Sequence, residues 1–290
     1  MKQLRIVALM AMIAVASSCQ KELSLETGTA GTGGGGGGTG GGGGTTGTKL
    51  TKIVTKDLTD SLVELFTYDA SNKLIAYSIK GSTLATPETD DRYTATRDAQ
   101  GRITQLKEIT SDDGGVTYDT IVTSVTYTGS TGTTLKYAIA ITNSTDRDSL
   151  VYTYTQGKIS KQTTYNYNGS TYDLSDESVY IYTSGNLTSV KSYDLTTGST
   201  LIIERNYTYD SKTTPLNLGM DDAVLWLEYY SGANNMTKID VVDHVLGLGN
   251  FALTYTHTYN SSNKPSASTM SAVVMGVPIP LAITSTYYYQ

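Results

Sequence analysis

The residue types that most often carry catalysis are scarce in this chain. Its 290 residues include one Cys and two His, which are Cys19, His244 and His257. Most zinc sites need several His or Cys ligands, so a zinc centre of the usual kind is not expected. A cysteine nucleophile would have to be Cys19, and the residues around Cys19 indicate a different role. We therefore predict no catalytic residue, no metal and no cofactor.

The acidic residues and the two histidines favour structural roles. Calcium needs six or more oxygen ligands, and the chain has no D-x-D-x-D-G loop, so its Asp-Asp pairs are interpreted as polar turns. Asp243 precedes His244, an order that invites comparison with a catalytic triad, but no G-x-S-x-G motif accompanies it. A pair of glycosidase carboxylates leaves no sequence signature, so a surface hydrolase that uses two carboxylates stays open as the least favoured function. The Asp-Asp pairs are Asp90-Asp91, Asp112-Asp113 and Asp221-Asp222.

One aromatic group could bind a ligand. Trp226, Tyr229 and Tyr230 lie within five residues of each other. Aromatic faces bury well against the apolar faces of sugar rings, so these side chains could form a stacking platform for a glycan. The alternative is that they fill a hydrophobic core.

The N-terminus has the layout of an export signal. Lys2 and Arg5 precede an uncharged apolar run of 11 residues, Ile6 to Ala16, which is too short to span a bilayer as a helix. Ala16-Ser17-Ser18 then leads to Cys19. This segment resembles the signal peptide and lipobox of bacterial lipoproteins, although Ala16 stands where that family prefers Leu. The resemblance implies cleavage after residue 18 and acylation of Cys19; the alternative is an ordinary secretory signal with a chance Cys.

Residues 19–48 are expected to form a lipidated N-terminus and a tether. Gln20-Lys21-Glu22 resembles the surface-export signal of Bacteroidota lipoproteins, which would place the protein on the outer face of the outer membrane. Residues 28–47 contain only Gly, Thr and Ala, with 14 glycines among 20 positions, and such a segment cannot bury apolar area. Residues 49–290 remain for a single Tyr- and Thr-rich domain. Removal of residues 1–18 changes the formal net charge from −6 to −8, so no nucleic-acid partner is expected.

A short pattern repeats along this domain. An aromatic or apolar residue is followed two positions later by Tyr, then by turn residues, then by Lys, Arg or Asn with Ile or Leu. A period in the range of ~20–50 residues indicates a repeated supersecondary unit. Y-x-Y places both rings on one face of a strand, and the turn leads into a returning strand, so each period is one hairpin. The copies start at residues 66, 93, 125, 152, 180, 207, 227 and 255, and the irregular stretch around Pro215 and Asp221 to Leu227 is interpreted as a loop with a short helix.

Consecutive hairpins predict an all-β fold. Seven or eight periods give a long antiparallel meander of about 14–16 strands. A sheet of that length curls because strands twist, so we expect a rolled or barrel-like form. Lys and Glu recur through the strands without a regular apolar band, which disfavours a membrane-spanning barrel.

The units resemble the tyrosine–aspartate repeats of bacterial surface shells. The whole layout also resembles Bacteroidota surface lipoproteins of unassigned function, some of which have a porin-like β fold. The resemblance implies a non-enzymatic protein, lipid-anchored in the outer membrane and facing the cell exterior, that binds or scaffolds glycans or other surface proteins. A glycan-binding accessory module of a nutrient-uptake system is the alternative.

Three short motifs resemble the Asp-Ser/Thr-apolar pattern of O-glycosylation in exported Bacteroidota proteins. A chain rich in Asp, Ser and Thr also produces such motifs by chance, and both origins stay open. The acceptor residues would be Ser61, Thr120 and Ser149.

Overall fold

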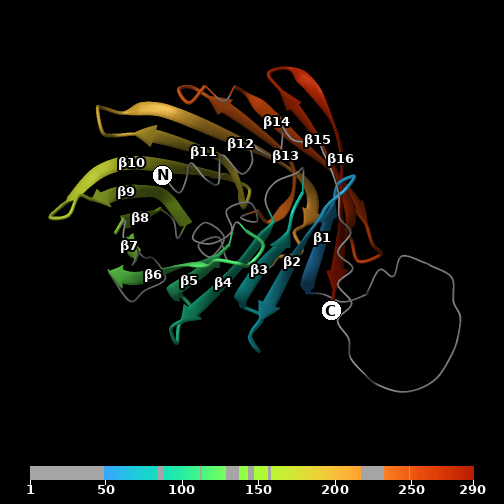
Figure 1. Ribbon diagram of the computed structural model, residues 1–290, viewed down its shortest axis with the longest axis horizontal. Helices are drawn as coiled ribbons and strands as arrows, with labels where there is room; N and C mark the ends of the chain where they lie inside the picture. The colour runs from blue at the N-terminus through green and yellow to red at the C-terminus, as the bar shows by residue number, and fades with distance from the viewer. Residues whose placement is uncertain are drawn as a thin grey trace, which may run out of the picture.

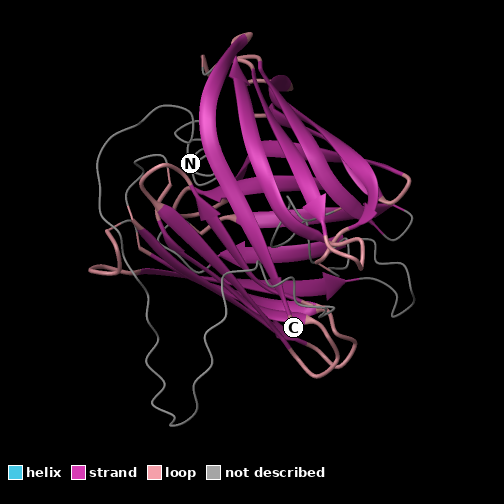
Figure 2. Ribbon diagram, turned by 90° about the vertical axis from the view of Figure 1, so that its right-hand side faces the viewer, coloured by secondary structure: helices cyan, strands magenta, loops and turns pink. Residues whose placement is uncertain are grey.

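The computed structural model describes residues 49–83, 88–111, 113–128, 137–142, 147–155, 158–216, 232–247 and 249–290, with the backbone alone at 137–142 and 282. Within these residues there are strands and no helix (Figure 2). The strands are β1 Leu50–Lys56, β2 Ser61–Tyr68, β3 Leu74–Gly81, β4 Thr89–Arg97, β5 Ile103–Thr110, β6 Asp119–Thr128, β7 Tyr137–Thr142, β8 Ser149–Thr155, β9 Lys158–Tyr167, β10 Tyr172–Thr183, β11 Asn186–Asp194, β12 Thr200–Thr213, β13 Asn234–Asp243, β14 Phe251–Tyr259, β15 Pro265–Val274 and β16 Val277–Tyr289.

The strands form one closed ladder. Each strand pairs antiparallel with the next one along the chain, and β16 pairs with β1, which closes the barrel. Figure 1 shows the resulting ring of strands, in which the first and last strands lie side by side. Closure removes the exposed edges that so long a meander would otherwise present. The prediction of an all-β, barrel-like meander of about 14–16 strands is confirmed.

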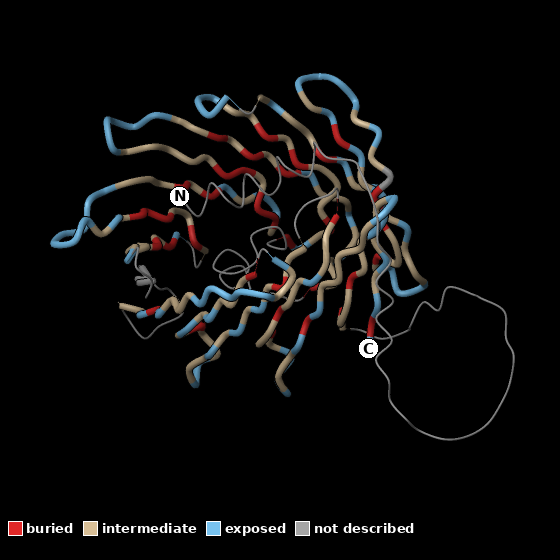
Figure 3. Tube along the Cα trace, viewed as in Figure 1, coloured by how far each residue is buried: buried red, intermediate tan, exposed pale blue. Residues whose placement is uncertain are grey.

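The two faces of the wall differ in chemistry. Residues paired across strands share a face, and the register places every buried apolar strand residue on the same side, from Ile53 opposite Tyr287 to Tyr180 opposite Val190. Side chains on the convex side of a curled sheet diverge into solvent, so this buried side is the inner face. The outer face alternates with it and carries mainly Thr, Ser, Lys and acidic residues. Buried positions are therefore scattered along the strands rather than covering them (Figure 3).

The buried residues form two clusters. The larger extends from β5 to β13 and includes Ile103, Tyr152 and Tyr207. The smaller joins β1, β2, β3 and β16. It also contains Leu216, which follows β12 in the chain and is fully buried against these distant strands.

The barrel has two different ends. We call the end where the even-numbered strands finish the turn rim, and the opposite end the loop rim. Three turns at the turn rim share one hydrogen-bond pattern, in which Oδ1 of an initial Asp or Asn accepts the backbone N–H of the residues two and four positions later. The fourth residue of each turn has a positive φ, which Asn and Gly tolerate best. These turns begin at Asp69, Asp98 and Asn260.

The strand order agrees with the prediction that each repeat is a hairpin, and one copy is corrected. Tyr180 and Tyr182 share the inner face, as Y-x-Y predicts. The copy expected at Leu227 lies outside the described residues. A further unit, not predicted from the sequence, ends at Tyr289, where β16 reaches the turn rim. The copy assigned to Tyr255 and His257 is shifted, because the bulged residue before its turn is Tyr259.

Candidate functional site

The turn rim holds a repeated contact that we call the tyrosine clamp. The last Tyr of a hairpin donates its hydroxyl to the backbone carbonyl oxygen of a buried residue one hairpin back. The Tyr68 hydroxyl donates to Leu50 O at 2.9 Å, and the Tyr289 hydroxyl donates to Pro265 O at 2.7 Å. The strand that contributes the carbonyl starts at, or next to, this acceptor residue, which is fully buried. The third such pair is Tyr209 with Leu187, at 2.7 Å.

Arg97 occupies the tyrosine position in one hairpin. Its Nη2 donates to Leu74 O at 2.9 Å and its Nη1 donates to Gly101 O at 2.9 Å. The carbonyl acceptor is thus retained where the donor differs, which indicates that the contact stabilises the wall.

Basic side chains lie over tyrosines near the turn rim, including the clamp residues Tyr68 and Tyr289. The residue just before or at the start of a strand is often Lys or Arg, and its charged group lies over the ring of the Tyr that ends the next strand. The Arg102 guanidinium is 4.6 Å from the centroid of Tyr127, and Lys158 Nζ is 5.1 Å from that of Tyr182. Such contacts contribute ~0.5–1 kcal/mol each at exposed positions. The further pairs are Lys49 with Tyr68 and Lys264 with Tyr289.

The clamp tyrosines hold their protons more tightly than an ordinary tyrosine does. Burial raises the pKa of Tyr68 to about 12. Burial also raises the pKa of Tyr289 far above its ordinary value. These hydroxyls therefore stay protonated over the physiological range and act as hydrogen-bond donors, which fits a structural role.

A polar network closes the base of the segment between β12 and β13. Asp210 accepts hydrogen bonds from the Tyr259 hydroxyl and from the Asn235 side chain. Thr214 N donates to Ala233 O at 3.1 Å, so the two ends of the segment meet. Burial and Asp210 together raise the pKa of Tyr259 far above its ordinary value. The network therefore anchors this long insertion to the turn rim.

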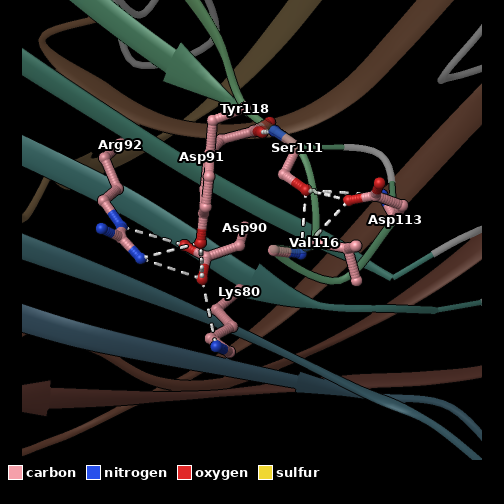
Figure 4. A network of polar contacts seen from close by, with 9 residues as sticks. Lys80, Asp90, Asp91, Arg92, Ser111, Asp113, Val116 and Tyr118 are labelled. Atoms are coloured by element: carbon pink, nitrogen blue, oxygen red, sulfur yellow. Dashed lines mark hydrogen bonds and ion pairs between the residues drawn. The ribbon is translucent and has the colours of Figure 1, made fainter.

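A second polar network lies towards the loop rim (Figure 4). Asp90 is 4% exposed and contacts Lys80 Nζ at 3.1 Å and Arg92 Nε at 3.1 Å. The Tyr118 hydroxyl donates to the same carboxylate at 3.2 Å. Burial would raise the pKa of Asp90, but the hydrogen bonds from Arg92 and Lys80 outweigh burial and hold that pKa below its ordinary value. Asp90 is thus a charged tie between β3, β4 and the loop after β5.

The Asp113 carboxylate shapes the same loop from within. Asp113 accepts the Ser111 hydroxyl at 2.7 Å, the Thr117 hydroxyl at 2.6 Å and the backbone N–H of Val116 at 3.0 Å (Figure 4). The hydrogen bonds from Ser111 and Thr117 are the main cause of a strongly lowered pKa at Asp113. The carboxylate shapes the loop and is occupied by it.

The candidate triad does not form. Asp243 accepts the backbone N–H groups of Val245 at 3.0 Å and Leu246 at 2.7 Å, so its carboxylate is used by the loop. His244 is exposed in that loop. His257 Nε2 lies 2.8 Å from Met236 O within the wall. The structural interpretation of both histidines is supported by these contacts.

The paired acids do not form a metal site in the described part of the chain. No group of three or more His, Cys, Asp or Glu side chains there could hold a metal ion. The prediction of a polar turn at Asp90-Asp91 is wrong, because both residues lie in β4 and point to its opposite faces. Asp91 Oδ1 accepts Ser111 N at 3.1 Å. Asp112 and the Asp221-Asp222 pair lie outside the described residues.

Several predicted site residues are not described by the structure. Cys19, the lipidation candidate, and the aromatic group Trp226, Tyr229 and Tyr230 all lie outside the described residues. The three O-glycosylation candidates are described, and all of them lie on the outer face where a strand leaves the loop rim. Ser61 and Ser149 are half-buried first residues of β2 and β8, and Thr120 is exposed near the start of β6.

Ion pairs cross the outer face in the middle of several strands. Lys161 Nζ lies 3.0 Å from Glu177 Oε2, between β9 and β10. Lys191 Nζ lies 3.6 Å from Glu204 Oε1, between β11 and β12. Lys238 Nζ lies 2.7 Å from Asp240 Oδ1 on β13. This part of the outer face is therefore suited to water.

Sequence reasoning missed the tyrosine clamp. The sequence does contain a signal for this contact. A basic residue followed directly by a buried aliphatic residue marks the start of a strand, and a Tyr marks the end of the next strand. Lys49-Leu50 with Tyr68 and Arg102-Ile103 with Tyr127 follow this rule. This rule relates the start of one strand to the end of the next strand. The predicted repeat relates a Tyr only to the turn that follows it.

Among the described residues, no helix is long and apolar enough to cross a membrane. No protein-family model matches the chain, and no curated protein matches it at a significant level.

Solved structures do resemble the barrel. A porin-like protein from Bacteroides uniformis superposes with a TM-score of 0.50 at 13% identity, over 83% of this chain and 98% of that one. A porin-like protein from Bacteroides vulgatus covers the same shares at 11% identity with a TM-score of 0.40. At this level of identity the first likeness concerns the fold alone. The chain therefore has the all-β architecture of the Bacteroides uniformis porin-like protein, reached through a very different sequence.

Proposed function

We propose that the chain is a non-enzymatic lipoprotein, anchored through Cys19 in the outer membrane and facing the cell exterior, that binds or scaffolds other surface molecules. The observation that carries this proposal is the use of the reactive side chains within the wall. Asp90, Asp113, Asp210 and Asp243 each hold a loop or a strand, and the clamp tyrosines hold the turn rim. The ion pairs of the outer face also favour a barrel surrounded by water rather than by lipid.

The anchor is tested by fractionation. Wild-type cells should retain the protein in the outer membrane and incorporate labelled palmitate into it, and external protease should cleave it on intact cells. Cys19→Ser should abolish the label and release the protein into a soluble fraction. Membrane retention of the Cys19→Ser chain would contradict the anchor. Turnover of a glycoside that is lost on one Asp or Glu substitution would contradict the non-enzymatic role.

A glycan-binding role is the second candidate, because one aromatic pair with an exposed member favours it. Tyr167 and Tyr172 flank the hairpin between β9 and β10, with ring centroids 5.2 Å apart and planes inclined by 50°. Tyr172 is 42% exposed, and the Arg147 guanidinium lies 5.9 Å from the centroid of Tyr167. Two neighbouring rings, one of them exposed, with a guanidinium beside them suit a sugar face and its hydroxyls.

This second candidate is tested on a glycan array. Tyr172→Ala should abolish any glycan signal, whereas Tyr288→Ala, a change at another exposed outer-face tyrosine, should preserve it. Trp226→Ala tests the aromatic group singled out from the sequence. Equal signals from wild type and the Tyr172→Ala and Trp226→Ala chains would exclude both aromatic groups as the binding site.

A further inference from the structure

The last three strands form a sector almost without charge. Lys264 is the only Lys, Arg, Asp or Glu from His244 to Gln290, although charged residues make up 17% of the whole chain. The outer face of this sector carries Thr, Ser, Ala and Val, whereas β9 to β13 carry ion pairs on theirs. The sector therefore has no ionic means of binding a charged partner along its wall.

Exposed apolar side chains gather where this sector meets the loop rim. Val245 and Leu246 are 59% and 36% exposed in the loop after β13. Val273, Met275 and Val277 are 38%, 74% and 60% exposed around the turn between β15 and β16. We call these five residues the apolar corner, and the loops that carry them are exposed along their tips (Figure 3).

The two loops of the apolar corner are held together. Met275 N donates to Asn250 O at 2.8 Å, which joins the turn after β15 to the loop after β13. A Cβ at Gly249 would lie 2.8 Å from Met275 Cγ, so the Met275 side chain covers that glycine. Asp243 caps the first loop through Val245 N and Leu246 N. The apolar side chains are thus presented by ordered loops.

We propose that the apolar corner inserts into the interface of a lipid bilayer. Five side chains on two hairpin tips are far fewer than the ~20–30 residues that each side of a stable protein–protein interface uses. Insertion of hairpin tips between lipid headgroups needs only a small apolar surface and no charge complementarity. The apolar corner is small, and the adjacent Asp243 carboxylate is engaged by backbone N–H groups of its own loop, so the corner fits a bilayer better than it fits a protein partner.

The length of the N-terminal segment allows this contact. The described chain begins at Lys49 on the turn rim, 30 residues after Cys19. A chain of that length spans at most ~100 Å, and the 13 residues of β16 span ~43 Å from rim to rim. A barrel anchored at Cys19 can therefore bring its loop rim to the membrane that holds the anchor. Only this step rests on the proposed function.

A site-specific dye tests the insertion. Cys19→Ser gives a full chain without cysteine, because Cys19 is the only one. In that chain Val277→Cys places a polarity-sensitive dye on the apolar corner, and Val116→Cys places it on a loop of another sector, at a position that is even more exposed. Neutral phosphatidylcholine vesicles with nitroxide groups on their acyl chains should quench the dye at 277 by roughly twofold more than the dye at 116. Equal quenching at both positions would overturn the proposal.

Substitution gives an independent reading. Met275→Asn together with Val245→Ser keeps a residue suited to the positive φ at position 275 and should lower vesicle partitioning by about tenfold. Leu58→Ser with Val116→Ser removes two other exposed apolar side chains and should leave partitioning unchanged, and thermal melts should show both chains folded. Equal partitioning of the two variants would overturn the proposal.

Sedimentation of the wild-type chain identifies the competing occupant. A dimer that dissociates on Met275→Asn with Val245→Ser, without acyl-chain quenching, would assign the corner to a second copy and overturn the proposal. The dye assay uses the Cys19→Ser chain and therefore does not depend on the lipid anchor. A failure of insertion would appear as a loss of quenching, whereas a failure of the anchor would appear in the fractionation of cells.

Discussion

Replacing Tyr289 by Phe removes one hydroxyl from the tyrosine clamp and leaves the ring in place. Tyr289 is 4% exposed, and its hydroxyl donates to Pro265 O at 2.7 Å. Loss of the donor leaves a buried carbonyl without that partner, which costs about 1–2 kcal/mol. For a domain of this size the melting temperature should fall by roughly 2–6 °C.

Thermal and urea unfolding followed by circular dichroism measure this change. Tyr288→Phe is the matched control, because Tyr288 adjoins Tyr289 but is 38% exposed on the outer face, where water replaces the lost contact. The control should stay within about 0.5 kcal/mol of the wild type.

A second clamp tests whether the contacts act independently. Tyr209 and Tyr289 lie four strands apart around the ring, or ~19 Å, so Tyr209→Phe and Tyr289→Phe should add within ~0.5 kcal/mol. The reasoning is refuted if Tyr289→Phe unfolds like the wild type, or if Tyr288→Phe is equally destabilised.

Four further outcomes are expected. The pKa of Tyr68 is raised to about 12, so its contribution to stability is complete below pH 10 and is lost as the pH rises towards 12; alkaline unfolding should begin later in Tyr68→Phe, and an unchanged alkaline midpoint would contradict this. Asp90→Asn should lower the free energy of unfolding by only about 1 kcal/mol at pH 7, since Lys80 and Arg92 are half-exposed and screened by solvent. Because the pKa of Asp90 is lowered in the folded protein, this difference should disappear as the pH falls below about 4. A difference in urea unfolding that stays constant with pH would contradict the ion-pair account. Gly81 and Gly198 both have positive φ, but only at Gly81 would a Cβ meet backbone, 2.1 Å from Ser61 O. Gly81→Ala should therefore be destabilised by ~1–3 kcal/mol more than Gly198→Ala. Equal melting temperatures of the two variants would contradict this. If the loop-rim motifs are glycosylated, intact-mass measurement of protein from its native host should show a glycan mass lost with each of Ser61→Ala, Thr120→Ala and Ser149→Ala, and an unmodified mass would exclude them.

The overall architecture was predictable because the repeat encodes local backbone structure, namely strands and the turns between them. Y-x-Y alternation and Asx-type turns such as that at Asp69 are local, so they can be recognised without knowing the neighbours. Closure of the ring follows less directly, since it depends on β1 and β16 having matching registers at opposite ends of the sequence.

The functional residues were less predictable because their roles depend on contacts between units. A Tyr before a turn predicts a strand end, but the acceptor of the Tyr209 hydroxyl is Leu187, in the preceding hairpin. Asp90 and Asp91 look equivalent in the sequence and are separated by the pleat, which sends one to each face of β4. Val245 and Met275 are exposed on two different loops, which a hydrogen bond from Met275 N to Asn250 O joins.

The pairing of Lys49 with Gln290 has a consequence for biogenesis. Each residue donates its backbone N–H to the carbonyl of the other, at 3.1 and 2.9 Å, so the seam is made from the first and last residues of the domain. The seam can form only after β16 has been synthesised and can reach β1. A chain that lacks the last residues of β16 would lose this seam and expose two unpaired strands, which recruit strands from other molecules. Truncation within β16 should therefore yield insoluble protein, even though every core residue before β16 is retained.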